Sequence, residues 1–209
     1  MADKRTHFGR AGEFFAMSEL LLRGWNVAVP VVDVGDDVFV IDDNDKTTFR
    51  LQVKSAESSN AADSNGAIGN FRLSRSQLNA ELQMELFYML LIRVKARWRY
   101  LVIPRPELSR IRSNFVEPPS TGKRIGRPPV TDAAAMKDAL MLRVTVHDNA
   151  ADGWNADLSN YLERWPDRLA PVTDGPGAVG GVTETADLPD PELAMDLELG
   201  PAPIPDHEK

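Results

Sequence analysis

The chain has 209 residues, of which 43% are hydrophobic and 26% charged, with no cysteine and a formal net charge of −7. This composition is typical of a globular protein with enough chain for a hydrophobic core. The lack of cysteine excludes a disulfide scaffold, a thiolate zinc site and a cysteine nucleophile. The chain opens without an apolar signal segment, and its longest apolar run, Leu86–Ile92, is too short to cross a bilayer. We therefore expect a cytoplasmic protein with no membrane partner.

The spacing of apolar residues and the turn signals between them predict the secondary structure. The first half is predicted to hold a helix over Arg10–Arg23, strands over Trp25–Val32, Val38–Ile41 and Thr47–Ser55, and a loop over Ala56–Gly69. Next come a short strand over Asn70–Leu73, a helix from the capping box Ser74-x-x-Gln77 to Leu82, and strands over Leu86–Val94 and Arg99–Ile103. The last predicted elements are a helix over Glu107–Arg112, a strand over Met141–Val146 and an amphipathic helix over Asn155–Trp165. This order predicts an α/β fold around a mixed central β-sheet flanked by helices.

The acidic charge is concentrated at the end of the chain. From Pro171 to Lys209 there are nine acidic residues and one basic residue, with 7 of the 15 Pro and 5 of the 14 Gly. Such a segment has too little apolar surface to offset the entropy lost on ordering. We therefore predict one folded domain over residues 1–170 and a disordered acidic tail over 171–209. The tail either keeps the chain in solution or folds on a protein partner.

The rest of the chain carries a local basic excess. Residues 1–170 hold 22 acidic and 23 basic residues, and the stretch from Arg93 to Arg127 holds ten basic residues and two acidic ones. Such a run is either a solvated surface or a patch for nucleic-acid phosphates. Residues 122–129 resemble the core of a minor-groove insert only weakly, because Ile125 replaces its first arginine. The predicted phosphate-binding residues are Arg97, Arg99, Lys123, Arg124 and Arg127.

Strict alternation along Thr47–Ser55 places polar residues on one face of a predicted strand. Arg50, Gln52 and Lys54 share that face, and three apolar side chains share the other. An amide oxygen and an ammonium group two residues apart, opposite an apolar row, are a suitable layout for an active site. The same pattern also fits an amphipathic strand whose polar face lies in water.

Two carboxylates can join this face. Asp37 follows Gly35 and opens the neighbouring strand, so a hairpin would bring its carboxylate near the partner strand, although Asp is also common in turns. Glu13 lies on the apolar stripe of the first predicted helix, where a carboxylate either needs a cation or benefits from the helix dipole. Taken together, these oxygen ligands and Lys54 indicate a divalent-metal site for phosphodiester chemistry.

Four short motifs carry a resemblance to a known family. They are Gly9-Arg10-Ala11-Gly12-Glu13, the segment from Leu21 to Pro30, Asp33-x-Gly35-x-Asp37, and Leu51-Gln52-Val53-Lys54-Ser55. In order and spacing they resemble the PD-(D/E)XK nuclease superfamily, near its small resolvase-like and Mrr-like branch, over about residues 8–56. The resemblance implies a restriction-endonuclease-like core and a Mg²⁺-dependent endodeoxyribonuclease that serves DNA repair or host defence.

The same resemblance implies a role for each residue. Asp37 would be the central metal-binding acid, and Gln52 would offer its side-chain carbonyl oxygen beside the backbone carbonyl of Val53. Lys54 would position or activate the attacking water, and Glu13 would bind a second metal or orient Lys54. Mg²⁺ is the expected metal, with Mn²⁺ as an alternative, because hard oxygen ligands and retained waters suit it. Gln52 departs from the usual Asp or Glu, which removes one negative charge, although some branches of the superfamily also use Gln there.

Other functions stay open at this stage. A nuclease-fold subunit that binds DNA without cutting it would account for Gln52, and a protein-interaction module would act through residues 171–209. DNA is the expected partner of the enzyme and of the inactive relative. A homodimer is a further alternative, because each site of such an enzyme cuts one strand, but no residue marks an interface.

Overall fold

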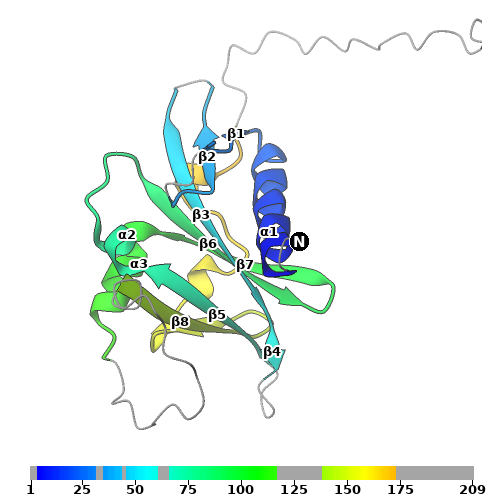
Figure 1. Ribbon diagram of the computed structural model, residues 1–209, viewed down its shortest axis with the longest axis vertical. Helices are drawn as coiled ribbons and strands as arrows, with labels where there is room; N and C mark the ends of the chain where they lie inside the picture. The colour runs from blue at the N-terminus through cyan, green and yellow to red at the C-terminus, as the bar shows by residue number, and fades with distance from the viewer. Residues whose placement is uncertain (1–3, 32–34, 44–45, 61–65, 117–137, 173–209) are drawn as a thin grey trace, which may run out of the picture. The chain divides into compact units, whose positions relative to one another are not determined.

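The computed structural model describes residues 4–31, 35–43, 46–60, 66–116 and 138–172. These residues form two β-sheets with helices around them (Figure 1). The predicted acidic tail, apart from Pro171 and Val172, lies outside the described residues, and so do the candidate phosphate-binding residues Lys123, Arg124 and Arg127.

The first sheet has the spatial order β1-β2-β3-β6-β7. Its strands are β1 (Asn26–Ala28), β2 (Val38–Ile41), β3 (Thr48–Glu57), β6 (Leu86–Val94) and β7 (Arg97–Pro104). The first three form an antiparallel meander, β3 and β6 pair in parallel, and β7 pairs antiparallel to β6. The α/β class with a mixed central sheet flanked by helices, predicted from the sequence, is therefore confirmed.

The central strand β6 is buried on both faces, which accounts for its unbroken apolar sequence. Phe87 and Met89 pack into the core that also contains the buried face of α1 (Lys4–Leu21). Tyr88 and Leu90 pack into a second core on the opposite face of the sheet. The sheet therefore separates two hydrophobic cores, and Arg50, Gln52 and Lys54 of β3 face the side opposite α1.

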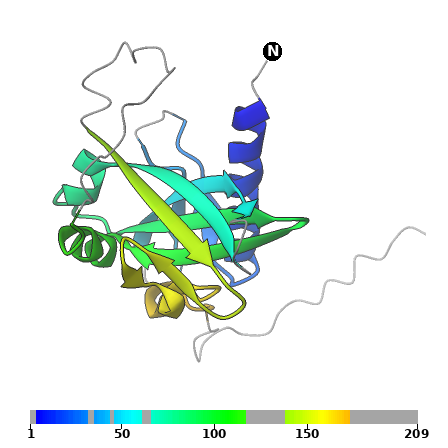
Figure 2. The ribbon, with the colours of Figure 1, turned by 90° about the horizontal axis from the view of Figure 1, so that it is seen from below.

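A second, antiparallel sheet covers that opposite side, together with two short helices (Figure 2). Its order is β10-β9-β8-β5-β4, with β4 (Ser59–Asn60), β5 (Ala67–Ser74), β8 (Ala139–Val146), β9 (Ala151–Gly153) and β10 (Ala156–Asp157). The helices are α2 (Arg75–Asn79) and α3 (Arg105–Ser113). The sequence predicted a single sheet and assigned Ala56–Gly69 to a loop, so β4 and the start of β5 correct that prediction.

The predicted helix over Asn155–Trp165 is wrong. The segment forms β10 and one turn of 3-10 helix (Ser159–Tyr161). Trp154, Asn155 and Glu163 have φ angles of 49°, 57° and 54°. A right-handed α-helix requires negative φ, so these turn residues interrupt it on both sides. The leucines that suggested a helical stripe are buried, but they reach the core from turns.

The helix boundaries also differ from the predictions. α1 begins six residues before Arg10, at Lys4, and α2 ends at Asn79 rather than at Leu82. On α1 the fully buried stripe is Ala16 and Leu20 with Gly12, whereas Leu21, predicted to face the core, is 55% exposed.

Gly12 allows α1 to lie directly against β3. A Cβ atom at this position would lie 2.0 Å from Ser55 Oγ and 3.1 Å from Leu91 Cδ1. Glu13 is the next residue, so this close approach also fixes the distance of Glu13 from β3. Gly9, one turn earlier on α1, has no such neighbour within 4 Å.

The two glycines provide a matched test of this contact. We expect Gly9→Ala to raise the free energy of unfolding by about 0.5–1 kcal/mol, because Ala has the higher helix propensity. We expect Gly12→Ala to lower it by about 1–3 kcal/mol, because the added methyl group overpacks the contact with Ser55. Urea unfolding measures both changes, and an equal gain from the two substitutions would contradict the close approach.

Candidate active site

The site is built around Asp37, where the pairing of β2 with β3 ends. β2 pairs with β3 only as far as Val38 opposite Leu51, although β3 continues to Glu57. The Asp37 N–H donates to the carbonyl oxygen of Leu51 at 3.1 Å, which continues the ladder by one bond. The Asp37 side chain then accepts the next free backbone N–H, that of Val53, at 2.7 Å to Oδ2.

This contact leaves one backbone oxygen of β3 without a strand partner at the same edge, within the described chain. The N–H and C=O of one strand residue point to the same side of the strand, so the Val53 carbonyl points toward the edge where Asp37 lies. No strand of the described chain pairs with that edge beyond Leu51. The edge therefore presents a carbonyl oxygen and a carboxylate to the same space.

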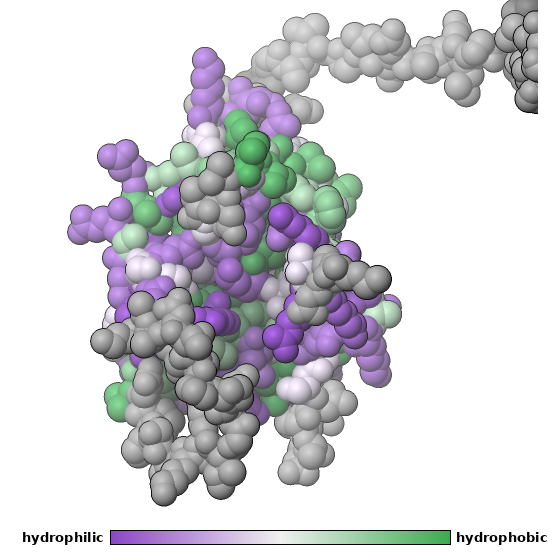
Figure 3. Space-filling view, in the orientation of Figure 1, coloured by the Kyte–Doolittle hydropathy of each residue, from purple (hydrophilic) through white to green (hydrophobic). Residues whose placement is uncertain are grey.

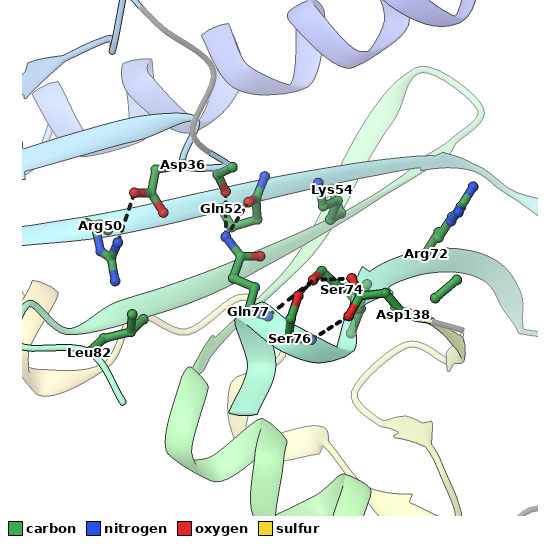
Figure 4. A pocket seen from close by; sticks show the side chains of 13 residues that line it. Asp36, Arg50, Gln52, Lys54, Arg72, Ser74, Ser76, Gln77, Leu82 and Asp138 are labelled. Carbon is green, nitrogen blue, oxygen red and sulfur yellow. Dashed lines mark hydrogen bonds and ion pairs between the residues drawn. The ribbon is translucent and has the colours of Figure 1, made fainter. Parts of the chain in front are cut away.

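Gln52 is nearly buried, with 2% of its surface exposed, and donates its side-chain amide to Asp37 Oδ2. Its carbonyl oxygen Oε1 accepts a hydrogen bond from Gln77 Nε2 at 3.0 Å. In this arrangement Gln52 presents its amide nitrogen, rather than its carbonyl oxygen, to the carboxylate. Figure 4 shows Gln52 on β3 and Gln77 on α2 pointing toward one another.

Lys54 and Glu13 lie in two neighbouring hollows. Lys54 and Gln52 line a cleft of about 580 Å³ between β3, the end of β5 and α2 (Figure 4). Glu13 and Asp37 line an adjacent hollow of about 320 Å³, and Asp36 lines both. Within the described residues, no carboxylate lies within 4.0 Å of the Lys54 ammonium group. Glu13 forms an ion pair with Arg10 at 2.5 Å.

Arg50, the third polar residue of this strand face, has a structural partner. Its guanidinium group lies 3.0 Å from the carboxylate of Asp36, which is 5% exposed, and a second nitrogen donates to the Met84 carbonyl at 3.4 Å. This ion pair ties the segment before β2 to β3. Arg50 is therefore occupied, and Lys54 is the cation of this strand face that stays available to a ligand.

The environment of Asp37 disfavours its negative charge. Burial raises the pKa of Asp37, and the charge of Glu13 adds to the rise. Lys54 and the N–H groups of Val53 and Gln52 lower the pKa, but not enough to cancel the effect of burial. A nearby cation stabilises the charged form of a carboxylate in this environment. The other three predicted side chains therefore all act on the Asp37 carboxylate. Gln52 contacts it directly, and Lys54 and Glu13 act through their charges.

These groups fit a Mg²⁺-type ion. Mg²⁺ prefers hard oxygen ligands and commonly uses one or two carboxylates while keeping several waters. Asp37 and Glu13 line the hollow of about 320 Å³, and the Val53 carbonyl lies at the strand edge next to Asp37. Among the described residues, no group of three or more His, Asp or Glu side chains could hold a metal by itself. Waters or substrate oxygens would therefore have to complete the coordination shell.

The two described candidates for phosphate binding differ in their contacts. Arg97 is exposed at the start of β7. Arg99 forms an ion pair with Glu163 and donates to the Asp148 carbonyl at 2.9 Å. Arg97 is therefore available to a ligand, whereas Arg99 joins β7 to the segments that hold Glu163 and Asp148.

Sequence reasoning did not include Gln77 or Tyr88 in the site. Gln77 was read only as part of a capping box, and its backbone N–H does donate to Ser74 Oγ at 3.1 Å. Its side chain, however, contacts Gln52, Tyr88 and the Gly35 carbonyl. The available signal was Tyr88 itself, because a hydroxyl in an otherwise apolar buried strand needs a hydrogen-bond partner.

The outer surface carries a separate apolar region. Figure 3 shows hydrophobic residues gathered over the carboxyl end of α1 and the neighbouring β1. In this part of the chain Leu21, Leu22 and Val29 are exposed. No helix in the described parts of the chain combines the length and hydropathy that crossing a bilayer requires.

Comparison with models of known protein families found no match, and comparison with curated proteins found no significant one. Among solved structures, the chain is similar to a bacterial homing endonuclease, I-Ssp6803I. The two share 17% sequence identity, the match covers 66% of this chain and 88% of that chain, and the TM-score is 0.37. A likeness at this level carries no functional weight, so the function rests on the geometry of the site.

The raised pKa of Asp37 has a consequence for stability that can be measured. A carboxyl group whose pKa is higher in the folded state stabilises that state when it is protonated. This stabilisation is complete when the pH is below the ordinary pKa of 3.8, and it is lost as the pH rises through the raised pKa of the folded state. Asn at this position keeps an oxygen acceptor for Val53 and Gln52 but carries no charge. We therefore expect Asp37→Asn to be more stable than the wild type at pH 7, with a gain that disappears at pH 3.

Urea unfolding at both pH values measures this difference. Asp152→Asn, at an exposed carboxylate on β9, is the control for the chemical change. A gain of equal size at both pH values, or a loss of stability at pH 7, would contradict the account of Asp37.

Proposed function

We propose that the chain is a metal-dependent endonuclease that hydrolyses phosphodiester bonds in DNA, with a site of the PD-(D/E)XK type. The observation that carries the proposal is the group around Asp37. A half-buried carboxylate with a raised pKa lies beside an unpaired lysine, a second carboxylate and an edge of β3 that no described strand pairs with. The parallel pairing of β3 with β6 after an antiparallel hairpin supports the restriction-endonuclease-like core that the motifs imply.

In this proposal each residue of the chain has a defined task. Asp37, Glu13 and the Val53 carbonyl hold Mg²⁺ or Mn²⁺, which supplies charge stabilisation at the scissile phosphate and lowers the pKa of water. Lys54 donates to a phosphate oxygen or to the attacking water, and its charge stabilises the negative charge that develops in the transition state. The water oxygen forms a new bond to phosphorus as the bond to the leaving sugar oxygen breaks. The attacking water loses a proton to solvent, and the leaving sugar oxygen takes up a proton from solvent.

The shape of the site supports a nucleic-acid substrate. Lys54 from β3 and Arg72 from β5 line the cleft of about 580 Å³ (Figure 4), and Arg97 is exposed at the start of β7. Phosphate groups are bound through such basic side chains largely without regard to sequence. The proposal has the chain acting on DNA in the cytoplasm.

One observation favours a second candidate function, a DNA-binding subunit that does not cut. Gln52 is neutral where the superfamily usually has a carboxylate, and its amide nitrogen faces Asp37. A site that never binds a metal would retain the fold and the basic cleft while losing catalysis. Measurements of DNA cutting and DNA binding on the same variants distinguish the two functions.

The purified protein is incubated with plasmid, branched and single-stranded DNA in Mg²⁺ or Mn²⁺. We expect cutting of at least one of these substrates, and a loss of about 100-fold or more in rate for both Asp37→Asn and Lys54→Met, because each removes transition-state stabilisation. Asp152→Asn and Lys46→Gln, away from the cleft, are the matched controls and are expected to cut like the wild type.

Cutting that survives undiminished in Asp37→Asn would exclude the proposed site. DNA binding without cutting under all conditions, with an affinity unchanged in Asp37→Asn and Lys54→Met, would instead support the non-catalytic subunit.

A further inference from the structure

A chain of hydrogen bonds connects the core of the protein to Asp37. The Tyr88 hydroxyl donates to Gln77 Oε1 at 3.2 Å, Gln77 Nε2 donates to Gln52 Oε1 at 3.0 Å, and Gln52 Nε2 donates to Asp37. Tyr88 is fully buried and Gln52 is 2% exposed, so little water can replace these partners. Each bond therefore restricts the orientation of the next side chain in the chain.

The direction of the bonds determines which atom Gln52 offers to the site. A side-chain amide has a donor end and an acceptor end that exchange places when the amide turns over. The Gly35 carbonyl can only accept a hydrogen bond, so the nitrogen of Gln77 points toward Gly35 and Gln52, and the oxygen of Gln77 accepts from Tyr88. The oxygen of Gln52 is then occupied, and its nitrogen faces Asp37. The nitrogen of an amide has its lone pair delocalised into the carbonyl group and does not bind a cation, so this arrangement suits the cation-free state.

Gln77 is also attached to the segment that carries Asp37. Its Nε2 donates to the Gly35 carbonyl at 2.5 Å, two residues before Asp37. Gly35 has a φ of +89°, and a Cβ atom there would lie 3.3 Å from Gln77 Nε2. Glycine therefore suits this turn for two reasons: it readily adopts the positive φ angle, and its lack of a side chain leaves room for Gln77.

We propose that Gln77 is a positioning residue that controls, through Gln52, whether the Asp37 site presents an amide nitrogen or a carbonyl oxygen. When a divalent cation binds, both amides turn over together. Gln52 then directs its oxygen to the cation and donates to Gln77 Oε1, while Gln77 Nε2 turns to the Tyr88 hydroxyl, which can accept as well as donate. The bond from Gln77 to the Gly35 carbonyl is lost, and the Gln77 side chain moves away from that carbonyl, because two acceptor oxygens repel each other at this distance. The inference rests on the proposed function, because it concerns the metal site of the nuclease.

Gln77→Glu tests this coupling directly. An ionised Glu has only acceptor atoms, so it can accept from Gln52 and from Tyr88 but cannot occupy the oxygen of Gln52. We expect Gln77→Glu to bind Mn²⁺ about tenfold more tightly than the wild type in the absence of DNA, a size within the range of couplings between contacting residues. Electron paramagnetic resonance of free Mn²⁺ measures the affinity without any reaction.

The added negative charge of Glu would also attract a cation, so the same substitution is made in a Gln52→Leu background. This background keeps the charge effect but has no amide to turn over. The proposal expects at most about a threefold gain there, well below the gain in the parent. Equal gains in both backgrounds would show that Gln77→Glu acts through charge alone and would overturn the positioning role.

A second measurement tests the hydrogen-bond chain without any metal. In the wild type, the side-chain NH₂ of Gln52 is held on Asp37 and should exchange slowly with solvent. Gln77→Met, similar in size but unable to hydrogen-bond, should speed this exchange about tenfold or more, and Tyr88→Phe should speed it less. Unchanged exchange in Gln77→Met would assign Gln77 to packing alone and overturn the proposal. If the wild type binds no Mn²⁺, the proposed nuclease function fails, whereas the exchange result still decides whether Gln77 orients Gln52.

Discussion

The hydrogen bond from the Val53 backbone to the Asp37 carboxylate is the constraint from which the arrangement of the site follows. β2 begins at Val38, directly after Asp37, and pairs there with Leu51. β3 continues past Leu51, so an unpaired backbone edge begins at Val53. A buried N–H left without a partner destabilises the fold, and Asp37 supplies that partner at 2.7 Å. The carboxylate is thereby fixed beside the Val53 carbonyl and within reach of Gln52. Structure and proposed chemistry depend on the same contact.

This arrangement keeps a negative charge where the protein disfavours it. Burial outweighs the effect of Lys54 and of two N–H donors on the pKa of Asp37, and Glu13 adds further repulsion. Charged groups that are destabilised in this way are common at functional sites, because a ligand or cation can relieve the repulsion. The net charge of −7 therefore says little about the site, where the charge of Lys54 acts on a carboxylate that a metal could neutralise.

The features that could be predicted from the sequence are those with a local cause. The alternation along β3 placed Gln52 and Lys54 on one face because side chains of a strand alternate between its faces, and β2 was predicted with its observed limits. The continuous apolar run of β6 identified a strand buried on both sides. The approximate position of Asp37 followed from the hairpin, since pairing brings the end of β2 to β3.

The features that were missed depend on contacts between distant parts of the chain. The second sheet requires β5 to pair with β8, about seventy residues later, and no local pattern specifies that pairing. The segment 155–165 has helical spacing, but the positive φ angles of Asn155 and Glu163 give it a different backbone. The capping pattern accounted for the backbone of Gln77 and gave no hint of its side-chain partners, which come from β3, β6 and the turn at Gly35. Lys123, Arg124 and Arg127 stay predictions.

The central claim is that Asp37 and the edge of β3 form a divalent-metal site, and anomalous diffraction from crystals soaked in Mn²⁺ tests it most directly. The account expects one strong peak within coordination distance of the Asp37 carboxylate and the Val53 carbonyl oxygen, with Gln52 turned so that its oxygen faces the ion. The peak should be absent from Asp37→Asn crystals treated in the same way. A wild-type crystal with no peak at this edge, or a peak that persists in Asp37→Asn, would contradict the account.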